Sequence, residues 1–201
     1  AKAVDTLSAA PAVVDAGAVV GAAEGANPHL WYSPSAVDAV SAAVTSELRT
    51  LAPAAGGYFD ERAADWQRAL QPYRGAIDAV KGRSVSRTFA ATESVYDLMA
   101  TAVGLRDTTP AGYRRAAANE SEVAPGDLHE LSSAMREGAV TVLLFNAQTE
   151  GAIPEQIRDA ARSANVPVVA ITESPPADTT FVQWQVKQLN ELYEALGPPS
   201  T

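Results

Sequence analysis

The stretch "AVTVLLF" (residues 139–145) is almost continuously apolar. Such a run is typical of a β-strand that is covered on both faces, as the strands of parallel sheets are. A second run of the same kind, "VPVVAIT" (166–172), follows after "IPEQIRDAARSAN" (153–165), whose early proline suits the first turn of a helix. Two buried strands joined by a helix predict an α/β fold with a parallel sheet and helices on both of its faces.

The same alternation continues on either side of these strands. Upstream, "SVSRTFAAT" (84–92) predicts a further strand followed by a short helix from about Ser94 to Val103, and "APGDLHELSSAMREG" (124–138) predicts a helix that ends at a glycine. Downstream, Thr180 and Gln183 have the spacing of a capping box and predict the start of a last helix.

Two helical patterns precede the strands. Ser33 and Pro34 suit the cap and the first position of a helix. The apolar residues that follow recur every three or four positions, which predicts one buried helical face: Val37, Val40, Val44, Leu48 and Leu51. A longer pattern from Phe59 to Val80 predicts a rod of about 33 Å with a kink at Pro72.

These patterns divide the chain into three parts. Residues 1–57 hold the first helix, residues 58–82 form a long connecting helix, and residues 83–201 form an α/β lobe. Within the first part, residues 1–26 are rich in alanine, valine and glycine, which indicates a short strand or an irregular segment and a loop.

The composition excludes several classes of protein. The net charge of −9, from 15 basic and 24 acidic residues, argues against a nucleic-acid binder, because such a protein needs a basic face. The chain has no cysteine, so thiolate zinc sites, iron–sulfur clusters and disulfides are excluded. No apolar stretch reaches the roughly 18 residues that suggest a membrane-spanning helix.

Polar residues just after the strands are the first candidates for a site, because ligands in open α/β sheets bind beyond the carboxyl ends of the strands. Glu93 and Glu173 each follow a predicted strand and stand directly after a threonine. His29, in "NPHLWYSP" (27–34), is one of only two histidines and lies in a stiff stretch between two prolines. Two carboxylates and one imidazole suit zinc, manganese or iron.

Each of these residues also has a purely structural interpretation. Glu93 suits the N-terminal turn of the helix that follows it, where the helix dipole favours an acid. Glu173 suits a charged surface loop, and His29 suits a loop or a cap. The second histidine, His129, is predicted to be a solvated helix residue. No G-x-S-x-G motif and no phosphate-binding loop is present.

Three fragments in this order, "NPHLWYSP", "FAATESVYDLMATAVGL" (89–105) and "VPVVAITESPPADTTFVQWQVKQLNELYEAL" (166–196), resemble the metal-binding solute receptors of ABC importers, the zinc/manganese family. The resemblance extends over nearly the whole chain. It implies two α/β lobes joined by a long helix, with the metal ion between them. Residues 1–57 would then be the remnant of a first lobe that lacks its opening strands and helices.

The resemblance also implies a ligand set. His29 matches the histidine of the family's Asn-Pro-His-x-Trp motif, Glu93 matches the ligand after the first strand of the second lobe, and Glu173 matches a carboxylate after a later strand. An earlier ligand histidine of the family has no counterpart, because no histidine precedes His29. An incomplete first lobe is further expected to expose an apolar surface.

The function implied is capture of a divalent transition metal (Mn²⁺, Zn²⁺ or Fe²⁺) and its delivery to an ABC transporter permease in the membrane, without catalysis. Such a receptor works outside the cytoplasm, in the periplasm or at the cell surface, and is held to the membrane only through a lipid anchor outside this chain. Two alternatives stay open: a metal-dependent hydrolase or chelatase-like enzyme that uses the same His/Glu/Glu cluster, and a module that binds a partner without metal.

Overall fold

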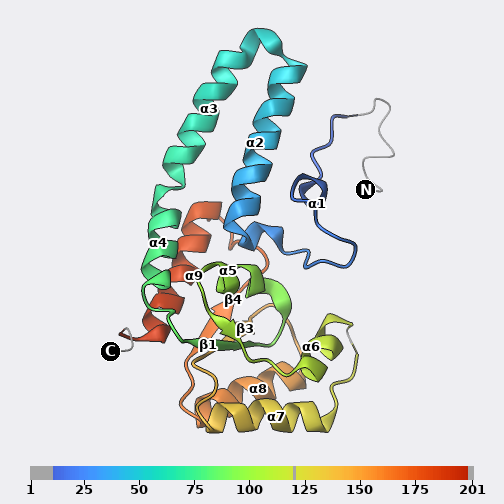
Figure 1. Ribbon diagram of the computed structural model, residues 1–201, viewed down its shortest axis with the longest axis vertical. Coiled ribbons are helices and arrows are strands. Elements are labelled where there is room, and N and C mark those ends of the chain that lie inside the picture. Colours follow the sequence, from blue (N-terminus) through green and yellow to red (C-terminus); the bar gives the residue numbers. More distant parts are fainter. Residues whose placement is uncertain (1–10, 120, 199–201) are drawn as a thin grey trace. The chain divides into compact units, whose positions relative to one another are not determined.

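The computed structural model describes residues 11–119 and 121–198, which fall into two compact units. The boundary between the units lies between Arg68 and Ala69. The described part of the first unit is built from helices and irregular segments, whereas the second unit contains a sheet with helices (Figure 1).

The first unit begins with an irregular segment that contains a single helical turn, α1 (Ala16–Val19). The side chain of Asp15 caps this turn by accepting a hydrogen bond from the Ala18 N–H at 2.7 Å. The sequence predicted a short strand or an irregular segment here. The irregular segment is found over residues 11–26, where there is no strand, and residues 1–10 lie outside the described part of the chain.

Helix α2 (Pro34–Leu51) begins where the sequence predicted it. Pro34 occupies the first turn, and the Ser33 hydroxyl accepts a hydrogen bond from the Ala36 N–H at 3.3 Å. A proline at this position costs little, because the N–H groups of the first turn have no partner within the helix. Local sequence therefore determines the start of α2.

The predicted buried face of α2 is wrong for its second half. Val44, Leu48 and Leu51 are 41%, 38% and 62% exposed, and among the residues of this helix only Ala36 is buried. Apolar spacing predicts a stripe along a helix, but burial needs a partner that covers the stripe. The expectation of an exposed apolar surface on this part of the chain is confirmed.

The predicted long helix over residues 58–82 is interrupted. After the short 3₁₀ turn at Pro53–Ala55, helix α3 (Gly56–Ala69) ends just before Leu70, and α4 (Gln71–Lys81) begins just after it. Pro72 lies in the first turn of α4. Proline cannot donate a backbone hydrogen bond inside a helix, so the predicted kink takes the form of a break between two helices.

The second unit is built on one sheet of four parallel strands within the described residues, in the order β2-β1-β3-β4. Strands β1 (Thr88–Ala91) and β3 (Val142–Asn146) are buried at every residue, as their apolar sequences predicted. Strand β2 (Arg106–Asp107) was not predicted, because two exposed polar residues carry no strand pattern.

Strand β4 (Val168–Ile171) departs from the expectation of full burial. It lies at an edge of the sheet, and its burial alternates, with Val169 and Ile171 buried and Ala170 exposed. An apolar run of this length is compatible with either a central or an edge strand, and strand order decides between them.

Helices cover both faces of the sheet (Figure 1). One face carries α6 (Ala111–Ala118), α7 (Pro125–Arg136) and α8 (Ala152–Ser163). The other carries α5 (Asp97–Ala102) and α9 (Phe181–Leu196), and α4 packs against α9. The α/β fold with a parallel sheet flanked by helices is confirmed. Helix α6 was not predicted, whereas α9 starts at the predicted capping box, where Thr180 and Gln183 bond each other reciprocally.

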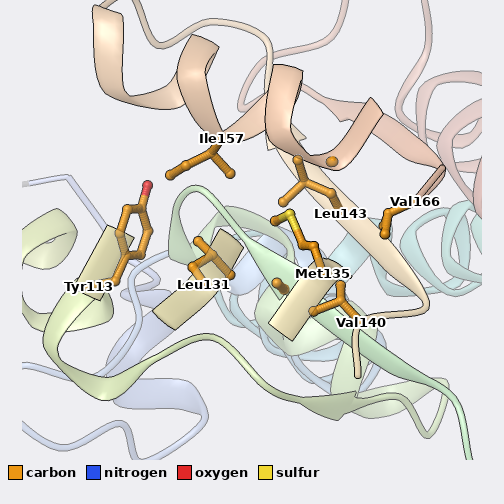
Figure 2. Close-up of a cluster of buried hydrophobic side chains, with 9 residues drawn as sticks. Tyr113, Leu131, Met135, Val140, Leu143, Ile157 and Val166 are labelled. Carbon is orange, nitrogen blue, oxygen red and sulfur yellow. The ribbon is translucent and has the colours of Figure 1, made fainter. Parts of the chain in front are cut away.

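Apolar side chains fill the space between the sheet and α6, α7 and α8 (Figure 2). Leu143 of the central strand β3 is 0% exposed and lies at the centre of this cluster. The side chains drawn with it come from three helices and the segments around the strands: Tyr113, Leu131, Met135, Val140, Ile157 and Val166.

We expect Leu143→Ala to lower the free energy of unfolding by about 2–5 kcal/mol, because it removes buried methyl groups and leaves a cavity. Val85→Ala is the control, since Val85 is 71% exposed and its truncation should change stability by less than about 0.5 kcal/mol. Urea unfolding followed by circular dichroism measures both. Equal losses for the two variants would contradict the assignment of the core to this cluster.

Candidate metal site

The two predicted carboxylates lie at the end of the sheet where the strands have their carboxyl termini. Glu93 follows β1, Glu173 follows β4, and Asn146 is the last residue of β3, which lies between those two strands. Because the strands are parallel, their carboxyl ends meet at the same edge. Glu93 is half-buried and Glu173 is exposed.

The structure brings both carboxylates to the side-chain amide of Asn146. The Nδ2 atom of Asn146 donates to Glu93 Oε2 at 2.7 Å and to Glu173 Oε1 at 2.9 Å. Asn146 itself is 2% exposed. The sequence reasoning missed this residue, although one signal was available: Asn146 is the polar residue directly after the apolar run, at the strand end where ligands bind.

The loop that follows β3 fixes the orientation of this amide. The Gln148 N–H donates to Asn146 Oδ1 at 3.1 Å, and because a backbone N–H is only a donor, the oxygen must lie on that side. Gln148 Oε1 in turn accepts from the backbone N–H of Glu173 at 2.5 Å. The Thr149 hydroxyl donates to Glu93 Oε1. Asn146 and Thr149 thus bond Glu93, whereas Asn146 and Gln148 bond the side chain and the backbone of Glu173.

A buried tyrosine lies close to the same strand end. The Tyr113 hydroxyl of α6 donates to the Thr92 carbonyl at 3.0 Å, next to Glu93. Burial of the phenol, together with the negative charge of Glu93, raises the pKa of Tyr113 to about 12. A cavity of about 280 Å³ adjoins this position and is lined by Tyr113, Glu93 and Thr149 among others.

His29 lies in the first unit, where the sequence "NPH" orients its ring. The Asn27 side-chain oxygen accepts from the His29 backbone N–H at 2.9 Å and lies 2.8 Å from His29 Nδ1. Because the backbone N–H identifies that atom as the acceptor oxygen, Nδ1 must carry the hydrogen. In the neutral imidazole, Nε2 then keeps its lone pair, which is the form that binds a metal ion.

Aromatic packing next to His29 restricts the ring further. Its ring meets the Trp31 ring edge to face, with centroids 5.3 Å apart. His29 also precedes a 3₁₀ turn, Leu30–Tyr32, in which Tyr32 is fully buried, and Ser33 then caps α2. The histidine is therefore held between a buried anchor and a hydrogen bond to Asn27.

The structure brings together two of the three predicted ligands, Glu93 and Glu173, and places His29 in the other unit. Over residues 11–119 and 121–198, no group of three or more histidine, cysteine or acidic residues is arranged to hold a metal ion. The role of the three residues as ligands therefore stays a prediction. His129 is exposed on α7, as the sequence predicted.

The fold is that of the metal-binding solute receptors of ABC transporters. The chain belongs to the ZnuA family, described as zinc-uptake complex component A, periplasmic, whose family model matches residues 1–195. The resemblance noted in the sequence is thereby confirmed. The family is one of receptors and not of enzymes.

No curated protein matches the sequence significantly. Among the described residues, no helix combines the length and the apolar character needed to cross a membrane.

Solved structures share the fold at low sequence identity. FpvC from Pseudomonas aeruginosa in complex with Mn²⁺ is 18% identical with a TM-score of 0.69, over 92% of this chain and 69% of its own. The periplasmic zinc-binding protein TroA from Treponema pallidum is 19% identical with a TM-score of 0.65, over 88% of this chain and 66% of its own.

The laminin-binding adhesin Lmb from Streptococcus agalactiae, in a mutant form, is 21% identical with a TM-score of 0.66, over 84% of this chain and 62% of its own. A metal-free periplasmic metal-binding protein from Candidatus Liberibacter asiaticus is matched over 63% of its length. The chain thus spans less than two thirds of these two relatives.

Ionisation of Tyr113 is expected to destabilise the fold at alkaline pH. Because the pKa is raised from 10.0 to about 12 in the folded protein, stability is intact below pH 10 and falls as the pH rises to about 12. At 1.36 kcal/mol per pKa unit, the loss is on the order of 2–3 kcal/mol.

Unfolding free energies of the wild type and Tyr113→Phe, measured between pH 9 and about 12, test this expectation, since the variant lacks the titrating group. Tyr58→Phe is the matched control, because Tyr58 is 59% exposed. The alkaline decline should be smaller in Tyr113→Phe and unchanged in Tyr58→Phe. An equal decline in both variants would show that Tyr113 ionises without cost to folding.

Proposed function

We propose that this protein captures a divalent transition metal and delivers it to the membrane permease of an ABC transporter. The observation that carries the proposal is the convergence of Glu93 and Glu173 on one buried amide at the ligand-binding edge of the sheet. Two like charges are held close together there, and a divalent cation neutralises both. Family membership supports the same conclusion.

In this proposal the metal ligands are His29, Glu93 and Glu173. His29 contributes Nε2, since Nδ1 is engaged with Asn27. Metal-binding histidines commonly donate their other ring N–H to a protein oxygen, which fixes the tautomer and the orientation of the ring. His29 belongs to the first unit, and the two glutamates belong to the second.

The donor set favours Mn²⁺ or Fe²⁺ slightly over Zn²⁺, because carboxylate oxygens suit harder ions, although zinc accepts the same ligands. The related structures bind different ions: FpvC is in complex with Mn²⁺, TroA is a zinc-binding protein, and one Candidatus Liberibacter protein holds Cd²⁺. Delivery to a permease places this protein outside the cytoplasm, in the periplasm or at the cell surface, which the periplasmic family supports.

The proposed division of labour in the chain follows the sequence patterns. Residues 1–57 belong to the first lobe, residues 58–82 connect, and residues 83–201 form the second lobe with the carboxylates. The connecting role of residues 58–82 is supported by the boundary between the two compact units, which falls within this segment.

Thermal melts with and without MnCl₂ or ZnCl₂ test the proposal. A receptor is stabilised by its metal, by about 2.7 kcal/mol when the free metal is 100 times the dissociation constant. We expect the wild type to melt at a higher temperature with one of these metals, and the double variant His29→Ala/Glu93→Ala to lose the increase.

The matched control is His129→Ala/Glu130→Ala, which removes the same two side-chain types from exposed positions of α7. This control should keep the wild-type increase in melting temperature. The proposal fails if the wild type gains no stability from either metal, and the ligand assignment fails if His29→Ala/Glu93→Ala gains as much as the wild type.

A further inference from the structure

The side-chain nitrogen of Asn146 has more acceptor oxygens around it than it has hydrogens to donate. The Nδ2 atom carries two N–H groups. Three acceptor oxygens lie within hydrogen-bond distance of it: Glu93 Oε2 at 2.7 Å, Thr149 Oγ1 at 2.8 Å and Glu173 Oε1 at 2.9 Å. The three oxygens therefore share two hydrogens, and the amide is the only neutral donor that both carboxylates have in common among the described contacts.

Burial and two further hydrogen bonds fix the position of this amide. Asn146 is 2% exposed, its backbone N–H donates to the Thr92 hydroxyl at 3.0 Å, and its Oδ1 accepts from the Gln148 N–H. These bonds leave Nδ2 facing the carboxylates. Hydrogen bonds to ionised carboxylates are among the stronger ones in proteins, so the amide opposes the repulsion between Glu93 and Glu173.

The arrangement leaves lone pairs for a cation. Each carboxylate oxygen has two lone pairs, so an oxygen that accepts one hydrogen bond can still coordinate a metal ion. The amide contacts one oxygen of each glutamate, and Thr149 contacts the second oxygen of Glu93. A cation can therefore approach carboxylates that are already gathered and oriented.

We propose that Asn146 is a positioning residue for metal capture, which holds Glu93 and Glu173 together before the metal arrives, with Thr149 in a supporting role. The inference rests on the proposed function, because it takes the two glutamates as ligands. Preorganised ligands lose less freedom when the metal binds, and this raises the affinity. Neither Asn146 nor Thr149 needs to contact the metal for this effect.

Calorimetric titration of the full chain with MnCl₂ and, separately, with ZnCl₂ tests the inference. Asn146→Ala is expected to weaken binding by about 10–100-fold, the usual cost of losing a group that supports a metal ligand. Thr149→Val keeps the shape of the side chain and should weaken binding in the same direction by a smaller factor. Asn190→Ala is the matched control on the exposed surface of α9 and should bind as the wild type does.

A second measurement separates positioning from general loosening of the fold. In the presence of a chelator, the effects of Asn146→Ala and Glu93→Ala on the melting temperature should be non-additive, because both remove the same hydrogen bond. Additive effects would overturn the bridge between these residues. Thr149, in a half-exposed loop position, carries the binding test if Asn146→Ala does not fold.

The outcomes distinguish the inference from the function on which it rests. If the wild type binds neither metal, the proposed function fails, whatever the melts in chelator show. If the wild type binds a metal and both Asn146→Ala and Thr149→Val bind it with wild-type affinity, the function stands and the positioning role of Asn146 is overturned.

Discussion

The central strand β3 is the constraint on which the second unit depends. It lies between β1 and β4 and is buried at every residue, so it needs apolar cover on both faces. Helices α6, α7 and α8 supply that cover on one face, where Leu143 is at the centre of the packed cluster. The same strand ends at Asn146, so a buried residue lies directly at the carboxyl end of the sheet, where ligands bind.

At the carboxyl end of the sheet, the buried side chain of Asn146 meets two charged side chains, and its hydrogen-bonding groups all have partners. A buried asparagine side chain is costly unless its hydrogen-bonding groups find partners, and here Asn146 finds them in Gln148, Thr149 and the two carboxylates. Glu93 and Glu173 remain at the surface end of this network. The result is a pair of carboxylates that are both bonded to the last residue of a buried strand.

In the first unit, local contacts orient the side chain of His29. His29 is oriented by Asn27 within its own short motif and is followed directly by the buried Tyr32 and the cap of α2. Farther along α2, Val44, Leu48 and Leu51 are exposed. The unit is thus well determined around the histidine and carries an uncovered apolar stripe elsewhere.

Local sequence determined the fold class, the start of α2 at Ser33, the capping box of α9 and the position of Glu93 and Glu173 after their strands, because caps and apolar runs act over a few residues. It could not reveal strand β2, the place of β4 at the sheet edge or the break at Leu70. It also missed Asn146, whose bonds reach Glu93 and Glu173 across 53 and 27 residues of chain. Only the tertiary structure decided those contacts, since they depend on the strand order that brings distant residues together at the carboxyl end of the sheet.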